Sequence, residues 1–246
     1  MYDFGARQLD PTTGLFTSMD PLCEKYYNIS PYSYCAGNPI NRIDPDGRDA
    51  VAIIDIENNI ITIKANYYVE TQTKPSIKNY SGRSVCPGYS NNDIQQMNEY
   101  NNYLNNLNLA ISEGEFNRYL LKFDLSFCDG GDNLNCKETA ANDSYEGINI
   151  GNSIEVYDET RRDFRQKENG DVIGGFTQES QNIIMNYSHD NKMNRIHEIF
   201  HTFGLEHSGD PSKLSGIMKY PPQTPNQQDA NNTLYNPYMS ERRFYK

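Results

Sequence analysis

Several features that define large classes of proteins are missing from this chain. Its 246 residues include no tryptophan, and no run of about 18 apolar residues occurs, so we expect no membrane span. The first residues lack the charged-then-apolar pattern of a signal peptide, so we expect that export would need another carrier. Lysine and arginine number 22 against 33 aspartates and glutamates. The resulting net charge of −11 disfavours nucleic acid or an anionic membrane surface as a partner.

Cysteine is scarce and odd in number, which leaves the redox compartment open. The five residues are Cys23, Cys35, Cys86, Cys128 and Cys136. Cys128 and Cys136 flank a turn-rich stretch, and they either pair across it or remain reduced. We interpret Cys86 as a buried or free thiol, with an inhibitory thiolate on a metal as the alternative.

Composition changes near residue 47. Up to that point Asp-Pro, Asn-Pro and Asp-Gly steps recur at short intervals, which predicts a turn-rich β segment. Residues 1–47 are too short to form a stable core alone. We therefore predict a boundary between this segment and a domain over residues 48–246.

The domain over residues 48–246 is predicted to be α+β. Apolar residues at helical spacing indicate one amphipathic helix over 93–112 that ends at Gly114. A later helix is predicted to begin after a cap at Asp190 or Asn191. The predicted strands include two hairpins and two single strands: 51–56 with 60–65, 172–176 with 182–187 around a turn at 177–180, 119–127, and 154–157.

Histidine is also rare, yet three of the four histidines lie between residues 197 and 207. His197 and His201 are four residues apart, so both rings leave the same face of a helix. Gly204 can adopt a left-handed conformation, which ends the helix and reverses the chain so that His207 becomes a third ligand. Three imidazoles leave a fourth tetrahedral position open, as in catalytic zinc sites.

Glu198 follows the first ligand and is placed to accept a proton from an attacking water. The alternative is a histidine pair on a helix surface without a metal. Glu198, Gly204 and His207 are three additional, independent matches to the motif, and the chain has only one other histidine, so the metal site is favoured. The remaining histidine, His189, is predicted to be a loop or cap residue.

The stretch from His197 to His207 resembles that of the metzincin zinc endopeptidases, which carry H-E-x-x-H-x-x-G-x-x-H and a downstream Met-turn. Met218 is the Met-turn candidate, and the resemblance implies that it forms an apolar floor beneath the ligands. Tyr220 occupies the position of a tyrosine that reaches the metal or the oxyanion in astacins and serralysins; a packing tyrosine is the alternative. The resemblance also implies a mixed sheet whose edge strand, here 172–176, pairs with an extended substrate.

The leading segment resembles the RHS repeat-associated core of RHS/YD-repeat shell proteins. Gly5-Ala6-Arg7, Asp20-Pro21, Asn38-Pro39 and Asp44-Pro45-Asp46-Gly47 are the landmarks, in order. In that family a variable C-terminal domain, commonly a toxin, follows the last landmark. We therefore interpret residues 1–47 as an RHS-core remnant and residues 48–246 as the delivered domain.

Together these interpretations predict a secreted or delivered zinc metalloendopeptidase. His197, His201 and His207 hold Zn²⁺, Glu198 and Tyr220 are catalytic, Met218 forms the Met-turn and Gly204 ends the helix. The expected partners are a polypeptide substrate and an RHS shell or immunity protein. Two alternatives stay open: a non-catalytic shell fragment with a degenerate domain, and a zinc hydrolase of cell-wall peptides.

Overall fold

A computed structural model describes residues 50–72, 85–158, 164, 173–178, 181–207, 216–236, 239 and 242–246, together with short strands within 2–16 and 74–75. The chain divides into two compact units, Met1–Pro45 with Glu146–Ile148, and Asp46–Tyr145 with Asn149–Lys246. In the first unit β1 (Tyr2–Asp3), β2 (Gln8–Asp10) and β3 (Leu15–Phe16) pair antiparallel. The other expectations for residues 1–47 lie outside the described residues.

The second unit is α+β, as the sequence predicts, and its centre is a mixed seven-stranded sheet. The strands are β4 (Val51–Asp55), β5 (Ile60–Glu70), β8 (Leu120–Gly131), β11 (Gly151–Tyr157), β12 (Gly175–Gln178), β13 (Asn182–Asn186) and β14 (Arg243–Tyr245). The order β12-β13-β11-β5 runs inward from one edge, and β8 pairs along the other side of β5. Most pairs are parallel, whereas β12 with β13 and β4 with β5 are antiparallel.

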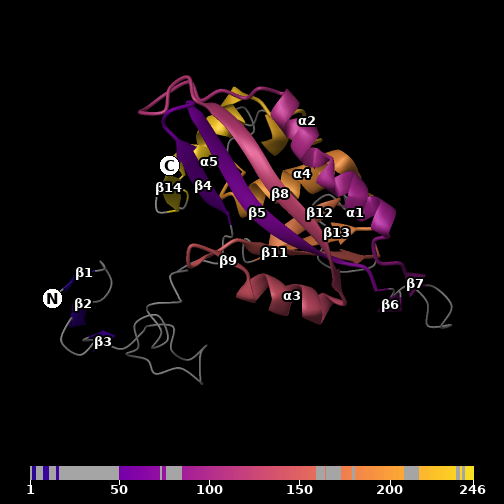
Figure 1. Ribbon diagram of the computed structural model, residues 1–246. Coiled ribbons are helices and arrows are strands. Elements are labelled where there is room, and N and C mark those ends of the chain that lie inside the picture. Colours follow the sequence, from indigo (N-terminus) through magenta and orange to yellow (C-terminus); the bar gives the residue numbers. More distant parts are fainter. Residues whose placement is uncertain are drawn as a thin grey trace. The chain divides into compact units, whose positions relative to one another are not determined.

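Helices cover both faces of this sheet (Figure 1). They are α1 (Asn91–Asn98), α2 (Tyr100–Asn106), α3 (Asn133–Asn142), α4 (Lys192–Thr202), the 3-10 turn η5 (Gly216–Met218) and α5 (Gln227–Tyr235). Alternate residues of β5, such as Ile61, Ile63 and Tyr67, are fully buried in the core. Tyr67 faces α4, where its hydroxyl lies 2.8 Å from Thr202 Oγ1. Tyr68, the next residue, points to the opposite face and donates to Asp143 at the end of α3.

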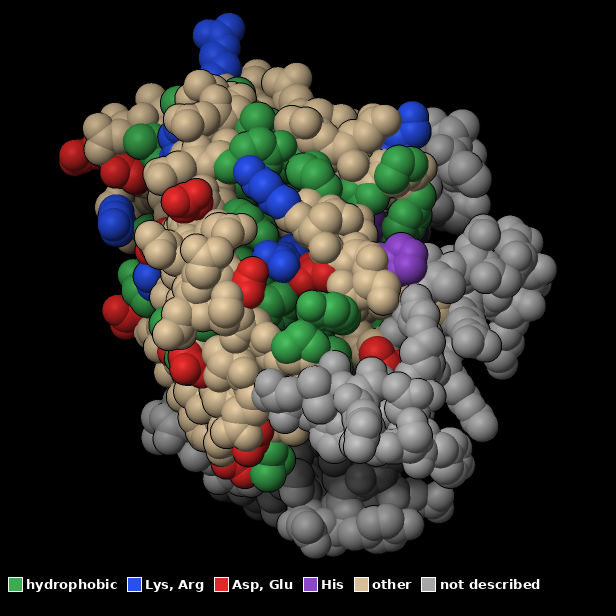
Figure 2. Space-filling model, turned by 90° about the vertical axis from the view of Figure 1, so that its right-hand side faces the viewer, with side chains coloured by type: hydrophobic (Ala, Val, Ile, Leu, Met, Phe, Trp, Pro, Cys, Tyr) green, Lys and Arg blue, Asp and Glu red, His purple; other side chains and the backbone are tan. Residues whose placement is uncertain are grey.

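Two short β pairs complete the described secondary structure: β6 (Lys74–Pro75) with β7 (Val85–Cys86), and β9 (Ser144–Tyr145) with β10 (Ile148–Asn149). Within the ranges described, no helix has both the length and the apolar character needed to cross a bilayer. On the face shown in Figure 2, acidic and basic side chains lie scattered among polar and hydrophobic ones.

The predicted strands are largely found. Strands β4 and β5 form the first hairpin, and β12 and β13 form the second. The second hairpin is shifted, however, because Thr177 and Gln178 belong to β12 and not to the turn. Residue 172 of the predicted edge strand lies outside the described residues, and the strand itself is Gly175–Gln178.

The predicted helix over 93–112 is wrong in extent. A capping box between Ser90 and Asp93 starts α1 at Asn91, the helix is interrupted at Glu99, and α2 ends at Asn106. The chain cannot continue as a helix because Asn108 takes a left-handed conformation with a φ of 49°. The spacing of apolar residues does not show that the helix ends at Asn106, because it contains no information on the backbone conformation of Asn108.

The same helices close one edge of the sheet with asparagine side chains. Asn98, Asn101 and Asn105 lie on one face of α1 and α2, and each pairs with one residue of β8: Phe127, Leu125 and Phe123 in turn. Each amide donates to the backbone carbonyl of its partner and accepts from the same residue's N–H. The three side chains therefore replace a neighbouring strand and leave this edge of β8 unavailable for pairing.

Replacing one of these asparagines should weaken the fold. In Asn101→Leu, the backbone N–H and C=O of Leu125 lose their partner, and we expect the free energy of unfolding to fall by about 1–3 kcal/mol. Asn102→Leu is the matched control, because Asn102 is exposed on the same helix; it should change stability by no more than about 0.5 kcal/mol. Urea unfolding of both variants measures the difference, and equal stability would show that the amides do not support the edge.

Candidate metal centre

Helix α4 begins where its sequence provides a cap. The side chain of Asn191 accepts hydrogen bonds from the N–H groups of Met193 and Asn194, which have no partner within the helix. Asp190 instead forms a two-pronged ion pair with Arg195, with both N···O distances 2.7 Å. Of the two predicted caps, Asn191 is confirmed. Asp190 precedes the helix and holds its first turn through the ion pair with Arg195.

The two faces of α4 carry different chemistry. Ile196, Ile199 and Phe200 are fully buried in the core, which holds the helix against the sheet. His197 and His201 leave the helix on the other face, one turn apart, as their spacing predicts. The core packing therefore determines the direction in which the imidazoles point.

Gly204 then reverses the chain, as the sequence predicts. Its φ is +90°, in the left-handed region that favours glycine. A side chain here would come within 2.9–3.1 Å of the Asn236 amide, which donates to Phe203 O across the turn. The reversal brings His207 back over α4.

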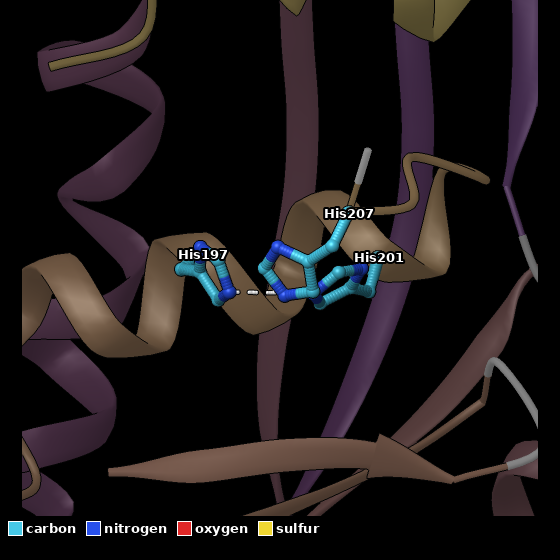
Figure 3. A group of neighbouring side chains, drawn as sticks. All are labelled: His197, His201 and His207. Carbon is cyan, nitrogen blue, oxygen red and sulfur yellow. Dashed lines mark hydrogen bonds between the residues drawn. The ribbon is translucent and has the colours of Figure 1, made fainter. Parts of the chain in front are cut away.

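The three histidines meet at one point (Figure 3). One ring nitrogen from each of His197, His201 and His207 lies within 4.8 Å of the others. The Nε2 of His201 is 3.3 Å from that of His197 and 3.2 Å from that of His207. Ligands about 2.0–2.1 Å from a tetrahedral zinc stand about 3.3 Å apart, so the spacing fits a metal of that size.

Backbone groups fix which nitrogens carry hydrogen. The Nδ1 atoms of His197 and His201 lie 2.6 Å from Ile217 O and Leu205 O. A carbonyl can only accept, so each Nδ1 is protonated and, in a neutral ring, each Nε2 presents a lone pair. His207 also bonds to the backbone, at Met218. This is the outer arrangement that orients histidine ligands in metal sites.

The surroundings also favour neutral imidazoles. Burial lowers the pKa of His197 to about 3, with a further decrease from His201, and the Ile217 bond opposes it. Burial lowers the pKa of His207 as well, against the Met218 bond. Because metal ligation requires the unprotonated nitrogen, both effects favour a bound cation.

Glu198 lies beside the histidines and is nearly inaccessible to solvent. Burial raises the pKa of its carboxyl to about 7, and a hydrogen bond from Thr177 opposes the increase. Thr177 Oγ1 is 2.8 Å from Glu198 Oε2. A carboxyl in this setting can both take up and release a proton near neutral pH.

The turn η5 contacts the histidine cluster through its backbone. Met218 is buried at the end of this turn, and Ile217 supplies the carbonyl that bonds His197. Asp229 of α5 holds the turn, since its Oδ2 accepts from the N–H of Ile217 at 3.1 Å and that of Asn226 at 2.8 Å. Met218, the Met-turn candidate, therefore ends a turn that Asp229 links to α5.

Tyr220 lies over two of the rings. Its ring centre is 5.0 Å from that of His197 and 5.1 Å from that of His207, and the second pair is stacked. Burial raises the pKa of its phenol to about 12, with a further increase from Glu198. The hydroxyl therefore keeps its proton at neutral pH and can serve as a donor.

A cleft of about 400 Å³ opens over the site. Strand β12 forms one wall, α4 the floor, and the turn after Gly204 the opposite wall. Its described lining consists of Ile173, Gly175, Phe176, Thr177, Glu198, His201, Leu205, Glu206, His207 and Tyr220. The predicted catalytic residues and two of the predicted ligands therefore line the same cleft.

Strand β12 presents backbone groups along this cleft. Asn186 N donates to Gly174 O at 2.9 Å, so residues of even number on β12 bond to β13. The N–H and C=O groups of Gly175 and Thr177 then point away from β13, and no described residue pairs with them. Ile173 has the same parity and uses its outward N–H to bond Phe164 O at 2.9 Å. As far as the described residues show, this edge is unpaired next to Glu198.

The cysteine alternatives are resolved where the structure describes them. Cys128 and Cys136 are free thiols, so the possible bridge between them is not formed. Cys128 is exposed on β8, whereas Cys136 is buried in α3 next to Gly130. Cys86 lies in the core with Sγ 3.7 Å from Val156 O, and it is not part of the histidine cluster. Cys23 and Cys35 lie outside the described residues.

Two residues that support the site are not identified by the sequence analysis. The sequence assigns Thr177 to a turn, and only the register of the hairpin shows that its side chain faces Glu198. Asp229 did carry a signal, because Asn226 and Asp229 have the spacing of a capping box. That pattern predicts a helix start, but not that the same carboxylate reaches η5.

Comparisons with known proteins leave the family open. No protein-family model and no solved structure matches the chain. Salivary gland surface protein 1 of Aedes aegypti is 44 % identical over 54 residues, which is 22 % of this chain. The chain spans only 2 % of that protein's length.

The glycine that begins η5 should be irreplaceable. Gly216 has a φ of +56°, and an added Cβ would collide with Asp229 Oδ2. Gly147→Ala is the matched control, because Gly147 has a φ of +84° with open space around it. We expect the control to cost about 1–2 kcal/mol from the backbone alone, and Gly216→Ala to cost more. Thermal unfolding compares them; equal losses would mean that the Asp229 contact adds nothing.

Removing a ligand should abolish metal binding. We expect one zinc per chain in the unaltered protein, and loss of that zinc in His201→Ala, because two imidazoles cannot complete the set. His189→Ala is the control, since His189 lies in the turn before α4, outside the cluster. Elemental analysis after dialysis measures both. Absence of zinc from the unaltered protein, or full zinc in His201→Ala, would contradict the assignment.

Proposed function

We propose that this protein is a zinc-dependent endopeptidase of the metzincin type. The observation that carries the proposal is the meeting of one ring nitrogen from each of three histidines beside a cleft that the buried carboxyl of Glu198 lines. When bound, zinc supplies Lewis-acid polarisation of the scissile carbonyl and lowers the pKa of an attacking water to about 7. His197, His201 and His207 would hold it.

The open edge of β12 supports a polypeptide as the substrate. An extended peptide can add to this edge through the outward N–H and C=O groups of Gly175 and Thr177. Such backbone pairing places a peptide bond along the cleft wall that faces Glu198. The opposite edge, β8, cannot compete, because asparagine side chains already satisfy its groups.

The protein's own residues then move the proton. Glu198 accepts a proton from the attacking water and afterwards delivers it to the nitrogen of the leaving amine, so the carboxyl ends the cycle as it began. Tyr220, which keeps its hydroxyl proton, can donate a hydrogen bond to the oxygen that gains negative charge. Stacking on His207 holds the ring in that position.

Delivery as a toxin or effector, with an RHS shell or immunity protein as partner, remains part of this proposal. It rests on the resemblance of residues 1–47, most of which lie outside the described residues. A peptide hydrolase of cell walls would use the same centre. Hydrolysis of a mixed peptide library and of cell-wall peptides, each with and without chelator, separates the substrates.

The role of Glu198 as general base can be tested separately from zinc binding. Glu198→Gln keeps the shape of the side chain but cannot take up a proton, so we expect zinc content and thermal unfolding to be unchanged. Turnover should fall by about 10²–10⁴-fold. Glu138→Gln, at an exposed site on α3, controls for the loss of one charge. Undiminished turnover in Glu198→Gln would show that this carboxyl is not the base.

A further inference from the structure

One side chain joins the open strand to the carboxyl of the site. Thr177 belongs to β12, and its Oγ1 lies 2.8 Å from Glu198 Oε2 and 3.1 Å from Glu198 O. Among the residues that the structure describes, it is the only side chain hydrogen-bonded to that carboxyl. We propose that Thr177 is a positioning residue that holds Glu198 in line with the substrate strand. This inference rests on the proposed peptidase function.

A carboxyl in this environment needs such a partner. Glu198 is almost completely buried, and a buried polar group without a hydrogen bond is costly. Its side chain has three rotatable bonds, so helix geometry alone does not fix where the oxygens point. The hydrogen bond from Thr177 favours one orientation of the Glu198 carboxyl. Because Thr177 belongs to the sheet, the sheet fixes the position of the base.

The hydroxyl can serve both states of the reaction. It carries one hydrogen and can also accept. When Glu198 is ionised, the hydroxyl donates to Oε2. When Glu198 takes up the proton from water on its other oxygen, Oε1, Oε2 is still an acceptor for the same hydroxyl. The hydrogen bond from Thr177 is therefore kept in both states, and the proton on Oε1 stays available for the leaving amine.

The same residue faces the substrate through its backbone. The N–H and C=O of Thr177 point to the open edge, whereas its side chain points to α4. A peptide paired with this residue is therefore held by the group that orients the base. The side chain should affect turnover, and the backbone should affect peptide binding, so the two can be separated by mutation.

The test compares Thr177→Val with Thr177→Ser in the full-length zinc-loaded protein. Valine keeps the shape but has no hydroxyl, and we expect kcat to fall about 10- to 100-fold, as for a lost hydrogen bond to a charged group. KM should stay within about twofold, because the backbone is unchanged. Serine should restore most of kcat. Crystal structures of both variants should show the Glu198 carboxyl displaced in valine and in place in serine.

Controls keep this outcome distinct from that of the proposed function. Thr62→Val, on β5 and away from the cleft, should leave kcat, zinc content and thermal unfolding unchanged. An unaltered protein that cleaves no peptide refutes the peptidase proposal. If it does cleave, then normal kcat in Thr177→Val, or an equal loss in Thr177→Ser, or an undisplaced Glu198 carboxyl in Thr177→Val, overturns the role of Thr177.

Discussion

The Nε2 atoms of His197 and His201 carry lone pairs and lie 3.3 Å apart, with the Nε2 of His207 3.2 Å from that of His201, and the remainder of the site serves this arrangement. Such lone pairs repel, and a shared cation turns the repulsion into attraction. The tautomers that create them are imposed by the backbone, through Leu205 and Ile217. The positions of two loops are therefore as necessary as the histidines themselves.

Those loops are held by parts of the chain far from the motif. Asn236 spans the turn at Gly204, and Asp229 holds the turn that contains Ile217. Asp229 lies in α5 and Asn236 at its end, so this helix holds the backbone on both sides of the histidine cluster. Tyr67 in the central strand bonds to Thr202 at the end of α4 and fixes the helix that carries His197 and His201. The sheet, α4 and α5 together make the centre rigid.

The sequence predicts those features that depend on local geometry. The spacing of His197 and His201 fixes their common face, and Gly204 and Asn191 mark the ends of the helix by backbone chemistry alone. Features that depend on tertiary contact are not predictable in this way. The register that turns Thr177 toward Glu198 and the reach of Asp229 to η5 both follow from neighbours distant in sequence. Whether Cys128 and Cys136 form a disulfide also depends on where the fold places the two thiols, and they do not pair.

X-ray absorption spectroscopy of the zinc-loaded protein tests the central claim most directly. The account predicts only nitrogen or oxygen neighbours at about 2.0–2.1 Å, with the outer-shell scattering of three imidazoles and a fourth position filled by a lighter ligand. His207→Ala should hold no zinc and give no such spectrum, because two imidazoles cannot complete the set. A sulfur neighbour at about 2.3 Å, or four protein ligands that close the site, would contradict a catalytic three-histidine centre.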